Sequence, residues 1–166
     1  VEVKLWAGNV GNGVREMLLK RFPQLEIFTS ADAAALKRAF QECDFLLHVS
    51  GPYLVADNDV AKWKNETGKS YGVYGITYND VNMSPKVNDL LTNAEFVFFR
   101  DSYSLEYAKS VGVKSKLMEF GPDGAFAVDT FNEAPARAFL AANNLQEGKF
   151  MCVIPKYRYT PYWLIP

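Results

Sequence analysis

Charged and hydroxyl side chains gather directly after an apolar run in the middle of the chain. Residues 96–99 (Phe-Val-Phe-Phe) predict a strand buried on both faces, and Arg100, Asp101, Ser102 and Ser104 follow at once. An arginine on a rigid strand end suits a carboxylate or a phosphate, because its planar fork donates to two oxygens. In a purely structural alternative, Asp101 or Ser102 caps the next helix and Arg100 pairs with a neighbouring carboxylate.

The elements that must position these residues alternate along the chain between apolar strands and amphipathic helices. The pattern predicts strands at residues 1–6, 25–28, 45–49, 71–76, 95–99, 116–120 and 150–155. It predicts helices at residues 8–22, 31–43, 57–67, 85–91, 102–111 and 132–144, with Ser30 and Ser84 as N-caps and Gly68 as a C-terminal stop. Such alternation is typical of a parallel sheet with helices on both faces, here with residues 45–49 as a central strand. The predicted fold class is therefore α/β.

This architecture indicates where a ligand would bind, because ligands of open α/β sheets lie at the carboxyl ends of the strands. Five predicted strands end on unusual residues: Gly8-Asn9, His48 with Ser50-Gly51-Pro52, Gly75 with Thr77-Tyr78, Arg100-Asp101-Ser102, and Gly121-Pro122-Asp123-Gly124. We therefore expect Ser50, Gly51 and Thr77 to line the same edge as Arg100. His48 is the only histidine. Two interpretations remain open for it, a residue of the core and a general base.

Composition excludes several classes of function. The 166 residues suffice for about one domain, and a net charge of -1 gives no electrostatic footprint for nucleic acid. No apolar run approaches the roughly 20 residues of a membrane span, and the first residues lack the features of a signal peptide, so we expect a cytoplasmic protein. Cys43 and Cys152 are expected to be buried free thiols, and no cluster of side chains has the spacing of a metal site.

The stretch "FVFFRDSYSLEYAKSVGVKSKLMEFGPDGAF" resembles part of the polysaccharide pyruvyl transferase family. In that family a strand ends in Arg-Asp-x-x-Ser, a helix runs to a glycine, and a Pro-Asp-x-Ala-Phe segment follows. "DFLLHVSGP", "TGKSYGVYGITY" and "FMCVIPKYRYT" extend the resemblance over residues 45–155, and the last is similar to the first strand of the family's second domain. Two departures leave the substrate and the reaction open: residues 50–52 are not a run of glycines, and residues 75–78 lack Gly-Pro.

The resemblance implies a glycosyltransferase-B-like bacterial protein with two Rossmann-like, three-layer domains. Residues 1–148 would be the first domain, and residues 149–166 the first strand and loop of the second. The implied reaction moves the enolpyruvyl group of phosphoenolpyruvate, as a ketal, onto a hydroxyl of a cell-surface polysaccharide or its precursor in exopolysaccharide biosynthesis. It needs no cofactor beyond that donor. A lipid-linked acceptor would bring the enzyme close to a membrane.

The resemblance also assigns roles to individual residues. Arg100 becomes a cleft arginine with Asp101 and Ser104 as its motif partners, and Asp123 becomes the second acid of the motif. Ser50 and Gly51 are carried over as the turn that lines the cleft, and Thr77 joins them as a substrate-binding residue from the next strand end. The acid that protonates the enol carbon is expected in the second domain, so we expect the 166-residue chain alone to be inactive.

Two alternatives remain open. One is a nucleotide-sugar glycosyltransferase of the same architecture, and the other is a non-catalytic homologue that binds a carbohydrate or an anion. The aromatic residues near the end of the sequence are expected to pack against a partner or to be poorly ordered: Tyr157, Tyr159, Tyr162 and Trp163.

Overall fold

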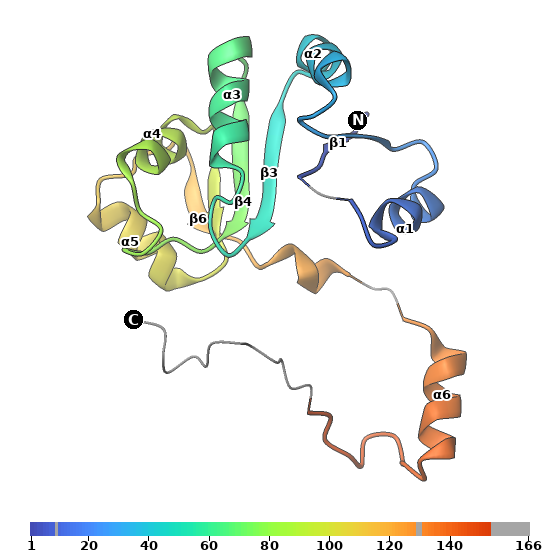
Figure 1. The fold of residues 1–166 in the computed structure, drawn as a ribbon. Helices are drawn as coiled ribbons and strands as arrows, with labels where there is room; N and C mark the ends of the chain where they lie inside the picture. The colour runs from blue at the N-terminus through green and yellow to red at the C-terminus, as the bar shows by residue number, and fades with distance from the viewer. Residues whose placement is uncertain (9, 129–130, 154–166) are drawn as a thin grey trace. The chain divides into compact units, whose positions relative to one another are not determined.

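The computed structural model describes residues 1–8, 10–128 and 131–153 (Figure 1). The chain divides into two compact units, residues 1–128 and residues 129–166. The expected domain boundary at residues 148–149 stays a prediction. In the described residues, none of the helices is both long and apolar enough to cross a membrane.

The first unit is built on parallel strands, which confirms the predicted α/β class. Four strands form one sheet in the order β3-β4-β5-β6: β3 (Leu46–Gly51), β4 (Tyr71–Ile76), β5 (Val97–Phe99) and β6 (Met118–Phe120). A separate parallel pair is formed by β1 (Lys4–Trp6) and β2 (Glu26–Phe28). The strand predicted to be central, β3, therefore lies at an edge of the four-stranded sheet.

The helices between these strands follow the predicted order. In the first unit they are α1 (Val14–Arg21), α2 (Ala33–Glu42), α3 (Asp57–Thr67), α4 (Pro85–Asn93), α5 (Ser102–Ser110) and the short 3₁₀ helix η1 (Gly124–Ala127). The second unit contains α6 (Glu133–Ala142). Residues 150–153, predicted to begin a last strand, form none in the described structure, and the remaining residues of that strand and the aromatic tail lie outside the described residues.

Capping residues explain several of the helix boundaries. Ser84 Oγ accepts from the Val87 N–H at 3.1 Å with proline at the next position, and α3 ends at Gly68 with φ 63, as predicted. The predicted cap of α2 is wrong, because Asp32 caps it by accepting from the Ala35 N–H at 2.9 Å. Ser30 Oγ is engaged elsewhere and accepts from Trp6 Nε1 at 2.9 Å.

The start predicted for the first helix is also wrong. The helix begins at Val14 rather than at Gly8, because Asn12 (φ 54) and Gly13 (φ 80) have left-handed backbone that no α-helix contains. Three apolar residues of this segment lie outside the core, because Val14, Met17 and Phe22 are exposed. The glycines of this segment therefore form a turn.

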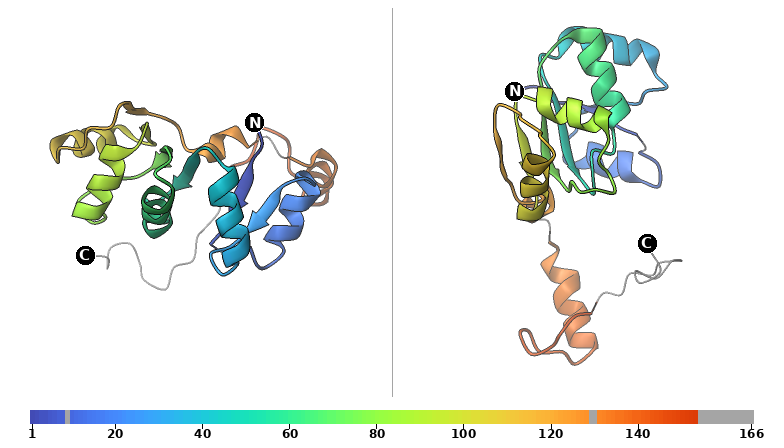
Figure 2. Two further views of the ribbon diagram at one scale, coloured as in Figure 1. Left: turned by 90° about the horizontal axis from the view of Figure 1, so that it is seen from above. Right: turned by 90° about the vertical axis from the view of Figure 1, so that its left-hand side faces the viewer.

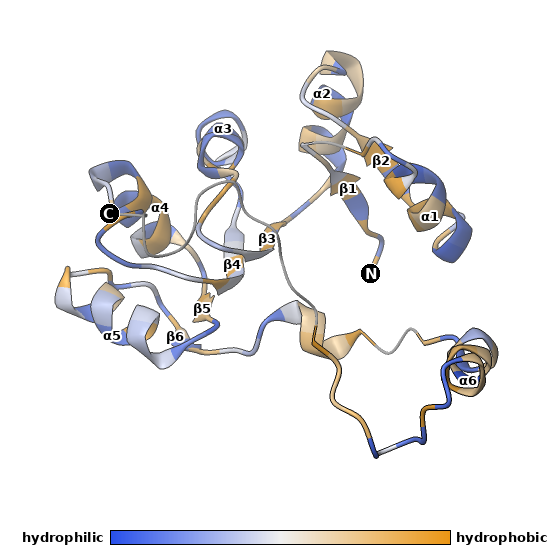
Figure 3. Ribbon diagram, turned by 60° about the horizontal axis from the view of Figure 1, so that its bottom comes forward, coloured by the Kyte–Doolittle hydropathy of each residue, from blue (hydrophilic) through white to orange (hydrophobic). Residues whose placement is uncertain are grey.

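Helices α3, α4 and α5 all lie on one face of the four-stranded sheet (Figure 3). Each new strand is added to the sheet on the same side of the strand before it, in the order β3-β4-β5-β6. Right-handed crossovers between strands added in this way place all the connecting helices on the same face. Their shared core consists mainly of fully or nearly fully buried side chains: Val60, Trp63, Val73, Leu90, Leu91, Val97 and Phe99. In the described part of the first unit, these three helices form one of the two predicted helical layers of the sheet, and no α-helix covers its other face.

The opposite face of the sheet shows the consequence. Leu47 and Val49 of β3 are exposed, and Phe96 and Phe98 are only partly buried although they alternate with fully buried neighbours. The rings of Phe96 and Phe98 contact each other, with 5.6 Å between their centroids. An apolar residue on this face therefore buries less accessible surface on folding than one on the helix-covered face, and it contributes less to stability.

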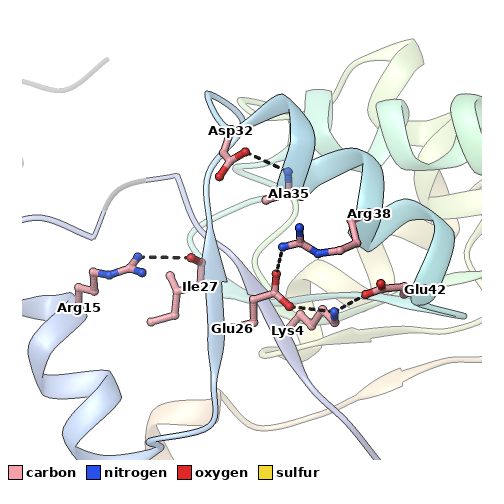
Figure 4. A network of polar contacts seen from close by, with 8 residues as sticks. All are labelled: Lys4, Arg15, Glu26, Ile27, Asp32, Ala35, Arg38 and Glu42. Carbon is pink, nitrogen blue, oxygen red and sulfur yellow. Dashed lines mark hydrogen bonds and ion pairs between the residues drawn. The ribbon is translucent and has the colours of Figure 1, made fainter.

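Helix α2 lies beside the β1–β2 pair (Figure 2) and connects it to the main core. The Phe40 ring packs edge-on against the rings of Trp6 and Trp63. The centroid distances are 5.5 Å to Trp6 and 5.3 Å to Trp63. Lys4 Nζ joins the same elements by donating to Glu26 at 2.8 Å and to Glu42 at 2.5 Å (Figure 4). These hydrogen bonds, first to Glu26 and then to Glu42, raise the pKa of Lys4 above its usual range.

The burial of the two cysteine side chains differs from the prediction that both are buried. Cys43 is half-buried, and burial raises the pKa of its thiol, whereas Cys152 is exposed. Cys152 lies in the second unit after α6, where an apolar context in sequence does not provide a core.

His48 is buried in β3, and its Nδ1 atom has no hydrogen-bond partner in the described structure. Burial lowers the pKa of His48 below its ordinary value of about 6.5, because the interior favours the neutral ring. The unfolded chain gains a proton there as pH falls below about 6.5, and stability contributed by neutral His48 is then lost.

We therefore expect His48→Leu to flatten the fall in unfolding free energy between pH 7 and pH 5. The difference in slope between the two proteins is limited to about 1.4 kcal/mol per pH unit, the value for one proton. Urea denaturation at both pH values measures it. Parallel pH profiles for wild type and variant would show that His48 takes up its proton equally in both states.

Candidate functional site

Four neighbouring strands each supply one polar side chain at the carboxyl edge of the sheet. Ser50 lies near the end of β3, Thr77 follows β4, Arg100 follows β5, and Asp123 follows β6 in the turn before η1. The backbone N–H of Arg100 donates to the Ile76 carbonyl at 3.1 Å, so the arginine begins from a strand end that is still paired. Because the strands are parallel and adjacent, residues up to 74 positions apart meet at one edge.

Hydrogen bonds join these four side chains into one network. Arg100 Nε donates to Thr77 Oγ1 at 2.7 Å, and Arg100 Nη1 donates to Asp123 Oδ2 at 2.8 Å. Ser50 Oγ donates to the other oxygen, Asp123 Oδ1, also at 2.8 Å. Arg100 Nη2 has no acceptor among the described residues, and 31% of the arginine side chain is exposed. The guanidinium is thus fixed on two sides and open on a third.

Asp123 is held as an anion. The Ala125 backbone N–H donates to its Oδ1 at 2.9 Å, and Arg100 and Ser50 donate as well. These hydrogen bonds, with the Ala125 N–H first, lower the pKa of Asp123 to about 2. A carboxyl group with this pKa carries no proton near pH 7, so Asp123 can orient the arginine but cannot act there as a proton donor.

Asp101 and Ser104 form a second, separate arrangement. Asp101 is the N-cap of α5: its Oδ1 accepts from the Ser104 N–H at 2.7 Å, and its Oδ2 accepts from Ser104 Oγ at 2.9 Å. Ser104 Oγ in turn accepts from the Tyr78 N–H at 2.9 Å. No hydrogen bond joins Asp101 to Arg100 in the described part of the chain. The structure therefore combines both elements of the structural alternative: Asp101 caps the helix and Arg100 pairs with a carboxylate, which is Asp123.

Ser104→Ala is expected to lower the unfolding free energy by about 1–3 kcal/mol. Ser104 is fully buried, and removing its hydroxyl leaves the Tyr78 N–H without an acceptor in the interior. Thermal or urea unfolding measures the loss. Ser110→Ala is the matched control, because Ser110 Oγ donates to the Tyr107 carbonyl on the exposed end of the same helix. Equal losses in the two variants would contradict the argument.

The other predicted residues have different surroundings. Gly51 is buried, and a Cβ there would lie 2.9 Å from the Tyr53 carbonyl oxygen, so the glycine allows the chain to turn tightly after β3. His48 belongs to the interior and makes no hydrogen bond to the network. Sequence reasoning missed the Ala125 N–H, because a backbone donor has no signature in a side-chain motif. In the described residues, no three His, Cys, Asp and Glu side chains gather to hold a metal ion.

Comparison with known proteins relates this geometry to a family. The profile of the family described as polysaccharide pyruvyl transferase matches residues 9–164 of the chain. The chain belongs to the polysaccharide pyruvyl transferase family. No curated protein and no solved structure matches it.

Membership confirms the resemblance seen in the Arg-Asp-x-x-Ser and Pro-Asp-x-Ala-Phe segments. It places the chain in a family of transferases, and so of enzymes that act on a donor and a sugar acceptor. In this pyruvyl transferase family member, the first segment supplies Arg100 and the second supplies Asp123, and the two side chains meet at 2.8 Å.

Proposed function

We propose that this family member transfers the enolpyruvyl group of phosphoenolpyruvate to sugar hydroxyls, forming a ketal and releasing phosphate. The observation that carries the proposal is the Arg100 guanidinium, held by Thr77 and Asp123 with Nη2 open at the carboxyl edge of the sheet. Phosphoenolpyruvate presents a carboxylate and a phosphate, the two groups that a fixed guanidinium binds best.

In this proposal Arg100 binds and orients the donor. Its positive charge stabilises the phosphate as it leaves, and its orientation is set before the donor arrives, so no reorganisation accompanies the reaction. The reaction also needs an acid that protonates the methylene carbon of the enol. Asp123 is excluded from that step by its pKa of about 2. We assign the acid to a second Rossmann-like domain, as in a glycosyltransferase-B-like enzyme.

The experiment uses the full-length protein with phosphoenolpyruvate and a panel of bacterial surface glycans or their precursors. We expect phosphate release that depends on the glycan, together with a new methyl signal of the pyruvate ketal in the proton spectrum of the product. Phosphoenolpyruvate binding without transfer to any glycan would favour the non-catalytic homologue. Sugar transfer from a nucleotide-sugar donor would favour the glycosyltransferase.

A further inference from the structure

Ser50 and Gly75 form an irregular step between two neighbouring strands. Ser50 in β3 has φ 27 and Gly75 in β4 has φ 72, so both have left-handed backbone inside extended strands. The pairing of β4 with β5 also shifts register between Tyr74 and Ile76, on either side of the glycine. Positive φ is ordinary for glycine but strained for serine, which indicates that the Ser50 conformation is maintained by its surroundings.

The two residues are in close proximity. A Cβ at position 75 would lie 3.2 Å from Ser50 Oγ and 3.5 Å from Ser50 Cα, and the first of these distances is tighter than ordinary contact. A glycine at 75 therefore leaves room for the serine side chain. Ser50 Oγ uses that position to donate to Asp123 Oδ1 at 2.8 Å, and it accepts from the Gly124 N–H at 3.4 Å.

We propose that Ser50 is a positioning residue that acts through Asp123 on Arg100, and that Gly75 makes its conformation possible. Ser50 and the Ala125 N–H fix one carboxylate oxygen, which directs the other oxygen of Asp123 at Arg100 Nη1. Thr77 fixes Nε, so Nη2 is presented to an anionic ligand in one orientation. The inference rests on the proposed function only for the identity of that ligand.

Two substitutions separate the hydroxyl from the backbone strain. Ser50→Gly removes Oγ and accepts φ 27 without strain, so this variant is expected to fold, whereas Ser50→Ala removes Oγ and keeps the strain. Gly75→Ala keeps Oγ but crowds it. Gly112→Ala, at the end of α5, is the matched control, because Gly112 has φ 85 and a Cβ there would meet nothing within 4 Å.

The first readout is the titration of the Asp123 carboxyl carbon by NMR. We expect its midpoint to rise in Ser50→Gly and Ser50→Ala, because the carboxylate loses one of its donors, and to stay unchanged in Gly112→Ala. The second readout is affinity for phosphoenolpyruvate in the full-length protein. We expect it to fall about 10-fold in the Ser50 variants and in Gly75→Ala, the effect of one misplaced hydrogen bond to a charged group.

The two readouts distinguish this inference from the proposed function. If wild type does not bind phosphoenolpyruvate, the proposed donor is wrong, while the Asp123 titration still tests the positioning role. An Asp123 midpoint in Ser50→Gly equal to that of wild type overturns the inference. Unchanged affinity in the Ser50 variants of a protein that does bind phosphoenolpyruvate overturns it as well.

Discussion

Arg100→Ala should lower kcat/KM for phosphoenolpyruvate at least about 100-fold, because two charge-assisted hydrogen bonds to the donor are lost and each is worth roughly 1.5–3 kcal/mol. The fold should remain intact by circular dichroism. The Arg100 side chain is 31% exposed and Asp123 is 24% exposed, and ion pairs in contact with water contribute little to stability.

Arg100→Lys should have a smaller effect, about 10-fold or more, because one charge-assisted hydrogen bond is lost. Lysine keeps the positive charge, but a single ammonium group cannot reach Thr77, Asp123 and a ligand in the planar geometry of a guanidinium. Arg38→Ala is the matched control, because Arg38, on α2, forms an ion pair with Glu26, on β2, at 2.5 Å. Its activity should equal that of wild type.

Two results would show that Arg100 is structural rather than functional. One is an unfolded Arg100→Ala variant beside a folded Arg38→Ala variant. The other is an Arg100→Ala variant with full transfer activity. Phosphoenolpyruvate binding measured separately from turnover shows whether the loss lies in KM or in kcat.

Much of the fold could be predicted from the sequence where local signals agree with tertiary packing. Helix α3 and strand β4 have the predicted bounds, because Gly68 lies between them and ends the helix sharply. The start of α1 could not be predicted, because an apolar period alone does not reveal that Asn12 has left-handed backbone. Burial on one face of the sheet depends on strand order, which is a property of the whole chain.

The sequence places the candidate residues near one sheet edge, but it does not decide which carboxylate Arg100 contacts. Arg100 and Asp101 are adjacent in sequence, yet successive residues at a strand end point in opposite directions. Arg100 therefore reaches Asp123, and Asp101 reaches the first turn of α5. The choice between the two carboxylates required knowing that β6 lies beside β5.

The residue just before the arginine gives the largest expected change in stability. Phe99→Ala should lower the unfolding free energy by about 3–5 kcal/mol, because a fully buried ring is lost and a cavity remains among the helices. Phe98→Ala is the matched control: the same substitution one residue earlier removes a ring on the uncovered face of the sheet, and it should cost clearly less. A loss near the upper end of that range approaches the whole stability of a typical domain, so Phe99→Ala is expected to unfold in part at room temperature. Urea denaturation of both variants measures the difference, and equal losses would contradict the one-sided core. Phe99 thus anchors the backbone from which the Arg100 side chain extends to Thr77 and Asp123 at the carboxyl edge of the sheet.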